Sequence, residues 1–171
     1  KKELDNDIQR IFVDPSGHHI IMCLRNGDNY YLHTKGTKVK KISRLQGVIE
    51  SIAFDKELSN ENSIKSFLVG TSMGFIYEMS LDSSGKEKNC SVVYHLQEQI
   101  PITSIYFDKV MEGNATYTYV VLTTSHESVR VHYYIGDTSG GIAQLFTNKS
   151  KDKKEKKDIQ MMMTELPGDI D

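Results

Sequence analysis

Short hydrophobic runs alternate with polar turns along most of this chain, and no long stretch keeps the three- and four-residue spacing of an amphipathic helix. The runs are rich in Ile, Val, Tyr and Phe, which favour β-strands. Asn26-Gly27 separates two of these runs, and this pair is a strong hairpin signal because both residues tolerate a positive φ. The pattern therefore predicts an all-β fold.

One heptapeptide pattern occurs three times, at residues 8–14, 49–55 and 102–108. Each copy reads Ile-x-x-Ile-x-hydrophobic-Asp, and the copies begin 41 and then 53 residues apart. A polar loop, a hydrophobic run, a tight turn and a second run follow each copy. The loops are expected at 14–17, 56–65 and 109–116, the first runs at 20–24, 67–69 and 119–122, the turns at 26–27, 72–74 and 125–127, and the second runs at 29–33, 75–81 and 129–135. A further strand is predicted at 38–43, 91–96 and 142–146, the last after the Gly-rich turn 136–141.

Repeated units of about four strands indicate the architecture. The run 20–24 does not alternate between apolar and polar residues, so both faces of that strand should be covered. A sandwich with one wet face would instead show strict alternation. Four-stranded sheets that stack face to face at this period are propeller blades. The fold class predicted for residues 1–146 is thus a partial β-propeller of about three WD40-like blades, and because three blades cannot close a ring, it is expected to belong to a larger propeller.

Two consequences concern the ends of this arrangement. Three blades leave two terminal sheet faces uncovered, so we expect either a capping element or association with another chain, with the runs 20–24 and 119–122 most affected. Residues 147–160 contain a lysine-rich stretch that cannot bury surface and is expected to be a flexible insertion. Residues 161–171 begin a further segment, and the sequence alone does not show whether residues have been removed from the lysine-rich stretch.

Composition excludes some classes of function. The 171 residues carry 21 basic and 23 acidic side chains, and a net charge of −2 argues against a nucleic-acid binder. No apolar run approaches the length of a membrane span, and the first residues, which begin at Lys1, do not resemble a signal peptide. Cys23 is expected to be a buried apolar residue, and Cys90 has no partner signature, as in a reducing cytosolic compartment. The glycosylation-type sequences at Asn89, Asn114 and Asn148 are interpreted as chance.

Three stretches resemble the amino-terminal domain of the deep-orange family of class C vacuolar protein sorting subunits. Residues 11–21 (IFVDPSGHHII) are similar to the family's opening stretch, residues 67–78 (FLVGTSMGFIYE) to its L-V-G-T-x-x-G-x-I-[FY]-E hairpin, and residues 139–146 (SGGIAQLF) to a third motif. The resemblance covers residues 8–146, and the lysine-rich insertion departs from it without interrupting a strand. It implies a β-propeller, which in the family precedes an α-solenoid and a RING finger.

The resemblance also implies a function. The family supplies a core subunit of the HOPS and CORVET complexes, which tether endosomal and vacuolar membranes before fusion. We therefore expect a non-enzymatic scaffold that binds other class C subunits in the cytoplasm, peripherally attached to late endosomes and vacuoles, with no cofactor, nucleic acid or small-molecule substrate. Two alternatives stay open: the propeller of another coat or nuclear-pore scaffold, and a propeller hydrolase.

No set of residues predicts catalysis or a metal site. His126 and His132 are six residues apart rather than four. Cys23 lies four residues after His19, but a metal site there is disfavoured because the adjacent His18 and His19 should point to opposite faces of a strand. A G-x-S-x-G motif, a Gly-rich phosphate loop and a Cys-x-x-Cys pair are all missing. The recurring Asp14, Asp55 and Asp108 are each predicted to end a strand and to bind nearby backbone.

One basic cluster is the single candidate surface site. It holds five positive charges without an acid among them: Lys35, Lys38, Lys40, Lys41 and Arg44. It either contacts anionic lipid headgroups or protects the open edge of an outer strand, where lysine discourages stray pairing. The edge interpretation is preferred. Nucleic acid is less suitable, because no stacking aromatics accompany the charges.

Overall fold

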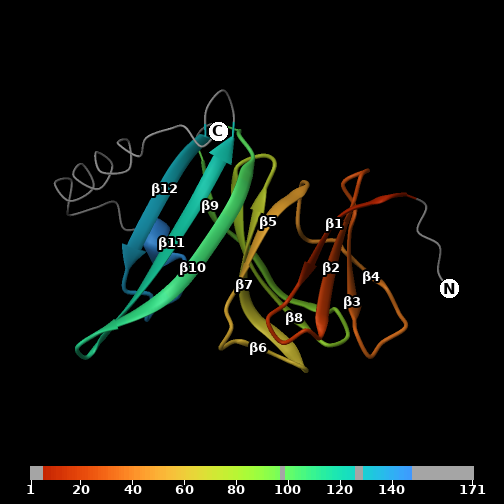
Figure 1. Cartoon of the computed structure of the whole chain (residues 1–171), viewed down its shortest axis with the longest axis horizontal. Coiled ribbons are helices and arrows are strands. Elements are labelled where there is room, and N and C mark those ends of the chain that lie inside the picture. Colours follow the sequence, from red (N-terminus) through yellow and green to blue (C-terminus); the bar gives the residue numbers. More distant parts are fainter. Residues whose placement is uncertain (1–5, 97–98, 126–128, 148–171) are drawn as a thin grey trace, which may run out of the picture.

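Three antiparallel sheets stand side by side in the structure, a computed structural model that describes residues 6–96, 99–125 and 129–147 (Figure 1). We call them blades 1 to 3. Blade 1 contains β1 (Ile8–Val13), β2 (His19–Leu24), β3 (Asn29–His33) and β4 (Lys40–Ile42), in that order. Blade 2 has the order β5 (Ile49–Phe54), β7 (Ser63–Thr71), β8 (Phe75–Asp82) and β9 (Glu87–His95), and β6 (Ser59–Asn60) pairs with β7. Blade 3 contains β10 (Ile102–Glu112), β11 (Ala115–Ser125) and β12 (Val129–Gly136), and α1 (Gln144–Thr147) follows it. The predicted all-β fold is confirmed.

Each of the three heptapeptides forms the first strand of a blade, as the repeat predicts. β1, β5 and β10 each lead into a hairpin with the following long strand. The turns after β2 and β7 use Gly27 and Gly74, whose φ angles are 89° and 78°. A residue with a Cβ rarely adopts this conformation, so glycine at these positions fixes where the chain reverses.

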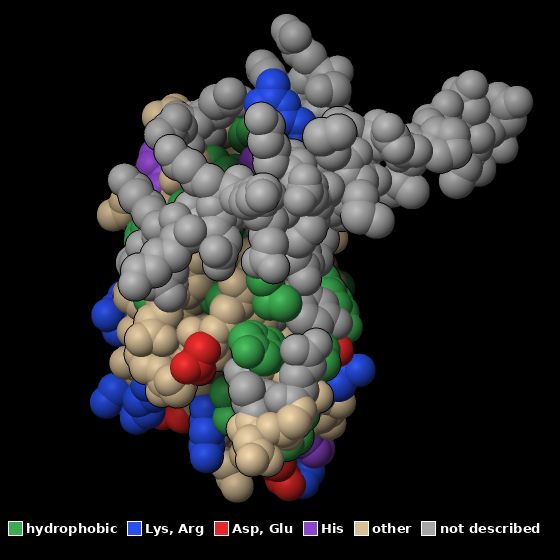
Figure 2. All heavy atoms as spheres, turned by 90° about the vertical axis from the view of Figure 1, so that its left-hand side faces the viewer, with side chains coloured by type: hydrophobic (Ala, Val, Ile, Leu, Met, Phe, Trp, Pro, Cys, Tyr) green, Lys and Arg blue, Asp and Glu red, His purple; other side chains and the backbone are tan. Residues whose placement is uncertain are grey.

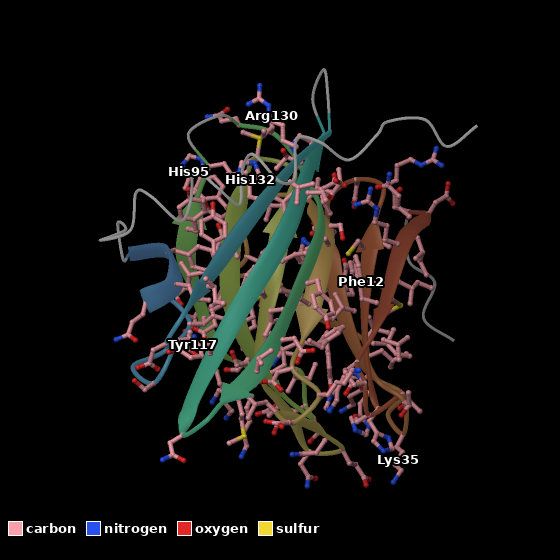
Figure 3. All side chains as sticks on the ribbon, turned by 60° about the vertical axis from the view of Figure 1, so that its left-hand side comes forward. Phe12, Lys35, His95, Tyr117, Arg130 and His132 are labelled. Atoms are coloured by element: carbon pink, nitrogen blue, oxygen red, sulfur yellow. The ribbon has the colours of Figure 1, made fainter. Side chains whose placement is uncertain are left out.

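The first hydrophobic core lies between blades 1 and 2. β2 and β3 contribute Ile21, Cys23 and Tyr31, and β7 and β8 contribute residues that include Phe67 and Met79. All five side chains are buried. Phe12 of β1 packs against the same core, and its label in Figure 3 shows where this core lies.

The second core lies between blades 2 and 3. Leu68 and Ile76 of blade 2 meet Ile102, Phe107 and Val120 of blade 3. Leu68 lies between Phe67 and Val69 in sequence, and these two neighbours belong to the first core. Successive residues of a strand point to opposite faces, so the run 67–69 is hydrophobic throughout because β7 is buried on both sides.

The predicted fourth strand of blade 3 is wrong. Residues 142–146 contribute to the short helix α1 instead, so the described part of this sheet has three strands. After Gly141, the N–H groups of Gln144, Leu145 and Phe146 each donate to the carbonyl three residues earlier. The helical turn buries Leu145 in the second core and packs Ile142 and Phe146 against the same core. A strand would point alternate residues of this run to opposite faces of the sheet.

Two predicted loops contain strand. Residues 109–116 form a continuous hairpin in which β10 runs to Glu112, β11 begins at Ala115, and Gly113 occupies the turn with φ 60°. Residues 56–65 contain β6 and the start of β7. In both places the strand ends beside a hairpin turn are polar, and such residues resemble a loop in the sequence because hydrophobic periodicity does not distinguish a solvated strand end from a turn.

The outer faces of blades 1 and 3 expose large hydrophobic side chains within the described residues. On blade 1, Ile11 and Val13 are 58% and 53% exposed. On blade 3, Tyr106 and Ile135 are 54% and 55% exposed. In the run 20–24, by contrast, Met22 and Leu24 are buried, so the exposed residues lie on the neighbouring strand β1 rather than in the predicted run.

We predict that the isolated chain associates with itself as its concentration rises, because exposed apolar sheet faces of this kind favour contact over solvation. Ile11→Thr combined with Ile135→Thr keeps β propensity and should shift the chain towards the monomer in sedimentation equilibrium. Lys40→Thr combined with Lys65→Thr, two exposed polar positions, should leave the association unchanged. A wild-type chain that stays monomeric at every concentration would contradict the expectation.

Candidate functional site

Asp14 lies at the joint between blades 1 and 2. Its Oδ1 accepts hydrogen bonds from the backbone N–H groups of His18 and His19, at 3.0 and 2.7 Å. Its Oδ2 accepts from the Ser16 N–H at 2.9 Å and also from the hydroxyl of Ser59, which belongs to β6 of blade 2. One buried carboxylate therefore shapes its own turn and holds the next blade.

These bonds decide the charge state of Asp14. Burial by itself would raise the pKa of the carboxyl group, but the hydrogen bonds from Ser16, Ser59 and His19 outweigh burial and lower the pKa to about 2. The ionised form is therefore the one that the folded protein favours. This is structural stabilisation rather than preparation for proton transfer, since a catalytic acid or base needs a pKa near the working pH.

The second repeated aspartate makes a matching contact. Asp55 accepts from the Glu57 N–H at 2.9 Å, and its Oδ2 lies 2.6 Å from the Nζ of Lys109 in blade 3. Asp108, in contrast, is exposed and accepts from the Lys109 N–H and the Tyr106 hydroxyl. The prediction that all three aspartates end a strand is wrong for Asp108, because β10 continues to Glu112. Asp14 and Asp55 each bind the following blade, and Asp108 belongs to the last blade described.

His19 forms the second polar contact across the first joint. The fully buried ring places Nε2 2.6 Å from the carbonyl of Asn60 and Nδ1 2.7 Å from the hydroxyl of Tyr31. A carbonyl only accepts, so Nε2–H donates to Asn60, and in the neutral ring Nδ1 accepts from Tyr31. Both ring nitrogens are thus used, and no lone pair is left for a metal ion.

The remaining histidines do not gather into one site. His33 donates from Nε2 to the Glu61 carbonyl at 2.9 Å and stacks on His18, with 5.9 Å between ring centroids. His95 and His132 lie at the opposite end of the molecule from Lys35, the close neighbour of His33 (Figure 3). His126 lies outside the described residues. No group of three His, Cys, Asp or Glu side chains with metal-binding geometry occurs in the described ranges.

Neither cysteine is activated. Cys23 is buried in the first core, as predicted, and burial raises the pKa of its thiol to about 12. Burial also raises the pKa of the half-buried Cys90 thiol. Nucleophilic cysteines need a lowered pKa, because the thiolate is the reactive form.

A pocket of ≈ 560 Å³ opens between the β2–β3 turn and the link from β4 to β5. The charged side chains that line it are Asp28 and Lys41, which lie 2.8 Å apart and neutralise each other. This is not the converging set of titratable groups that the alternative of a propeller hydrolase requires.

Some residues of the basic cluster are bound to acidic side chains, and others are not. Lys35 pairs with Glu61 at 2.5 Å, Lys41 pairs with Asp28, and the Arg44 backbone N–H donates to Glu87 at 3.0 Å. The hydrogen bond with Asp28 raises the pKa of Lys41, and the hydrogen bond with Lys35 lowers the pKa of Glu61. Lys38 and Lys40 are exposed and have no acidic partner at ion-pair distance in the described part of the chain. Lys40 and Lys41 lie in β4, the short strand at the edge of blade 1.

Sequence reasoning missed the contacts that cross between blades. The partners in these contacts are 41 to 54 positions apart, as in His19 with Asn60, Asp14 with Ser59 and Asp55 with Lys109. The repeated aspartate was the available signal. The predicted binding of nearby backbone is confirmed at Asp14 and Asp55, but the reach of these aspartates into the next blade depends on how the sheets stack.

Comparison with known proteins gives a consistent result. The family model for the Pep3/Vps18/deep orange beta-propeller domain matches residues 1–170. The Vacuolar protein sorting-associated protein 18 homolog of Danio rerio is 29% identical over 148 residues, 82% of this chain and 15% of that protein. Vacuolar sorting protein 18 of Arabidopsis thaliana is 31% identical over 99 residues, 55% of this chain and 10% of that protein. The Drosophila melanogaster homolog is 29% identical over 141 residues, 71% of this chain and 14% of that protein. The chain thus spans a small part of these relatives' length.

We predict that Asp14→Asn lowers the free energy of unfolding by about 2 kcal/mol at pH 7. Lowering the pKa of the carboxyl group from 3.8 to about 2 stabilises the folded state by about this amount, and asparagine carries no charge to be stabilised. The folded-state pKa is below the unfolded value, so this stabilisation is complete above about pH 4 and is lost as the pH falls towards about 2. The difference between wild type and variant in urea unfolding should therefore be constant from pH 7 to about 5 and shrink below that range. Asp108→Asn, at an exposed position of the same repeat, should change stability much less. Equal effects of the two substitutions would show that Asp14 does not hold the joint.

The anionic-surface hypothesis predicts a specific loss at Lys38 and Lys40. Lysines near a charged bilayer contribute about 1 kcal/mol each, so Lys38→Glu with Lys40→Glu should weaken pelleting with phosphatidylserine vesicles by about tenfold or more. Lys56→Glu with Lys65→Glu gives the same change in net charge at other exposed positions and should have a smaller effect. If the wild-type chain does not pellet, or both pairs behave alike, the cluster serves the strand edge alone.

Proposed function

The chain belongs to the Pep3/Vps18/deep orange β-propeller family, and from this membership we propose that it is a non-enzymatic interaction scaffold in a vesicle-tethering subunit. The family match over residues 1–170 is the observation that carries the proposal. The whole protein would act in transport from endosomes to the vacuole or lysosome, with other class C subunits as its partners.

The chemistry of the described residues supports a scaffold. The buried Asp14 and His19 use their polar atoms to join blades, and the two cysteine thiols have raised pKa values. A propeller of rigid, mutually buried sheets leaves its rims and loops for recognition, because these are the parts that the stacking does not consume.

The two alternatives from the sequence have less support. The propeller of another coat or nuclear-pore scaffold would share the architecture, but the family match concerns the Vps18 group. A propeller hydrolase would need a pocket with several converging titratable groups, whereas the described pocket carries one neutralised pair.

The proposed location is the cytoplasmic face of late endosomes and vacuoles, by peripheral attachment. No described helix is long and apolar enough to cross a bilayer. Attachment would then come through partner subunits or through the basic residues of blade 1.

Affinity purification of the full-length protein should recover other class C tethering subunits. Leu68→Asp places a charge in the second core, where it would unfold the propeller and should remove at least one of these subunits. Asp108→Asn, an exposed change in the same region, should recover the full set. Recovery of coat subunits without class C subunits would refute the assignment, and a complete set with Leu68→Asp would show that the partners bind elsewhere on the protein.

A further inference from the structure

The repeated heptapeptide gives each blade two different faces. In β1, β5 and β10 the register with the next strand shifts between the first and third residues of the heptapeptide, so each of these strands contains a β-bulge there. The extra residue of a bulge shifts the alternation of side chains between the two faces of a strand. The two isoleucines, three positions apart, can therefore share one face with the hydrophobic sixth residue, whereas a regular strand would place them on opposite faces.

Positions one, four and six of the heptapeptide form what we call the rear face, which is turned towards the preceding blade. In blade 2, Ile49 belongs to the first core, and Ile52 and Phe54 pack against that core. In blade 3, all three equivalent residues belong to the second core: Ile102, Ile105 and Phe107. The Ile-x-x-Ile-x-hydrophobic pattern is thus the part of each blade that packs on the blade before it.

The opposite side of each blade, which we call the front face, carries a hydrogen-bond donor at position three. The guanidinium Nη1 of Arg10 donates to the carbonyls of Glu50 and Ile49, at 2.8 and 3.4 Å. The hydroxyl of Ser51 donates to the carbonyl of Ile102 at 2.7 Å. In both joints, therefore, a side chain from position three binds the backbone at the bulge of the following blade.

Two of these faces have no blade against them in the described part of the chain. The rear face of blade 1 is exposed: Ile8 is 45% exposed, whereas Ile49 and Ile102 at the same position are fully buried. On the front face of blade 3, Ser104 at position three is exposed. Val131 and Ile135 of β12 are exposed as well, and Figure 2, which views the molecule from this side, shows hydrophobic side chains on it. Blades 1 and 3 lie at opposite ends of the molecule (Figure 1).

We propose that the front face of blade 3 binds the rear face of blade 1 in a second copy of the chain, head to tail. The contact repeats the joints within the chain, with the Ser104 hydroxyl donating to the backbone at the bulge of β1, as Ser51 does at the bulge of β10. The exposed Asp108 would face the β1–β2 turn of the second copy. His18 has the same place after Asp14 as Ser59, the partner of Asp14, has after Asp55.

The match between the two faces is the reason for choosing a second copy as the occupant. One face comes from the first described blade and the other from the last, and both belong to the same repeat, so they fit each other as consecutive blades do. Contacts between two different faces of one protein either close a ring or extend into a filament. Two copies supply six blades, and propellers close with about four to eight, so we expect closure at a dimer.

Sedimentation equilibrium of the 171-residue chain tests which faces meet. Ile11→Glu changes the rear face of blade 1 and Ile135→Glu the front face of blade 3, both at exposed positions, so circular dichroism should show that each variant keeps its fold. A charge buried in the contact is unfavourable, so each variant alone should associate at least tenfold more weakly than the wild type. A mixture of the two should associate again, because one unchanged blade 3 then meets one unchanged blade 1.

Two control variants separate this contact from general stickiness. Val92→Glu, at an exposed hydrophobic position of β9 in blade 2, should associate like the wild type. Ser104→Ala removes the donor alone and should weaken association about fivefold, whereas Ser91→Ala, at an exposed position of β9, should not.

Several results would overturn the proposal. A wild-type chain that stays monomeric would do so, and so would a mixture of Ile11→Glu and Ile135→Glu chains that associates no better than its components. Wild-type association of the Ile135→Glu chain alone would show that like faces meet instead. An unchanged Ser104→Ala chain would overturn the hydrogen bond assigned to the contact.

Discussion

Burial of the middle sheet, blade 2, on both of its faces is the constraint on which the rest of this structure depends. A four-stranded sheet has too little internal hydrophobic contact to be stable alone, and blade 2 reaches full burial only because blades 1 and 3 cover its two sides. Phe67, Leu68 and Val69 show this within three residues, since the first and third face blade 1 and the second faces blade 3. Removing either neighbour would expose half of this strand to water.

The polar contacts at the joints follow from the same constraint. Sheets that meet through apolar side chains could slide against one another, because hydrophobic contact is not directional. Asp14 and His19 at the first joint, and Asp55 with Lys109 at the second, add directional bonds between blades. Buried groups of this kind are costly unless their partners are in place, so each joint favours one alignment of its two sheets.

The sequence predicts the strands better than it predicts the joints. The repeated heptapeptide identifies the first strand of each blade, and Gly27 and Gly74 identify hairpin turns inside blades 1 and 2, because these signals are local in the sequence. A short, mostly apolar run such as residues 142–146 suits a strand or a helical turn, and only its packing, with Leu145 buried in the second core, separates the two. The partners of Asp14 and His19 could not be read from the chain, because they depend on stacking of sheets more than forty residues apart. In the basic cluster, the sequence shows five cations, while the acids that pair with two of them come from turns elsewhere in the chain.

The use of buried polar side chains to align the blades limits which residues are free for other functions. The polar side chains Asp14 and His19 lie in the first joint, where their hydrogen bonds are satisfied by the fold, and the lowered pKa of Asp14 couples its ionisation to folding. A residue such as Asp14 cannot also take part in a reaction without loosening two blades at once. The parts of the described chain that the joints do not use are rim loops, exposed charges such as Lys38 and Lys40, and sheet faces that no neighbouring blade covers. A propeller built in this way can vary its loops while its joints stay fixed, and that combination is consistent with the scaffold function proposed above.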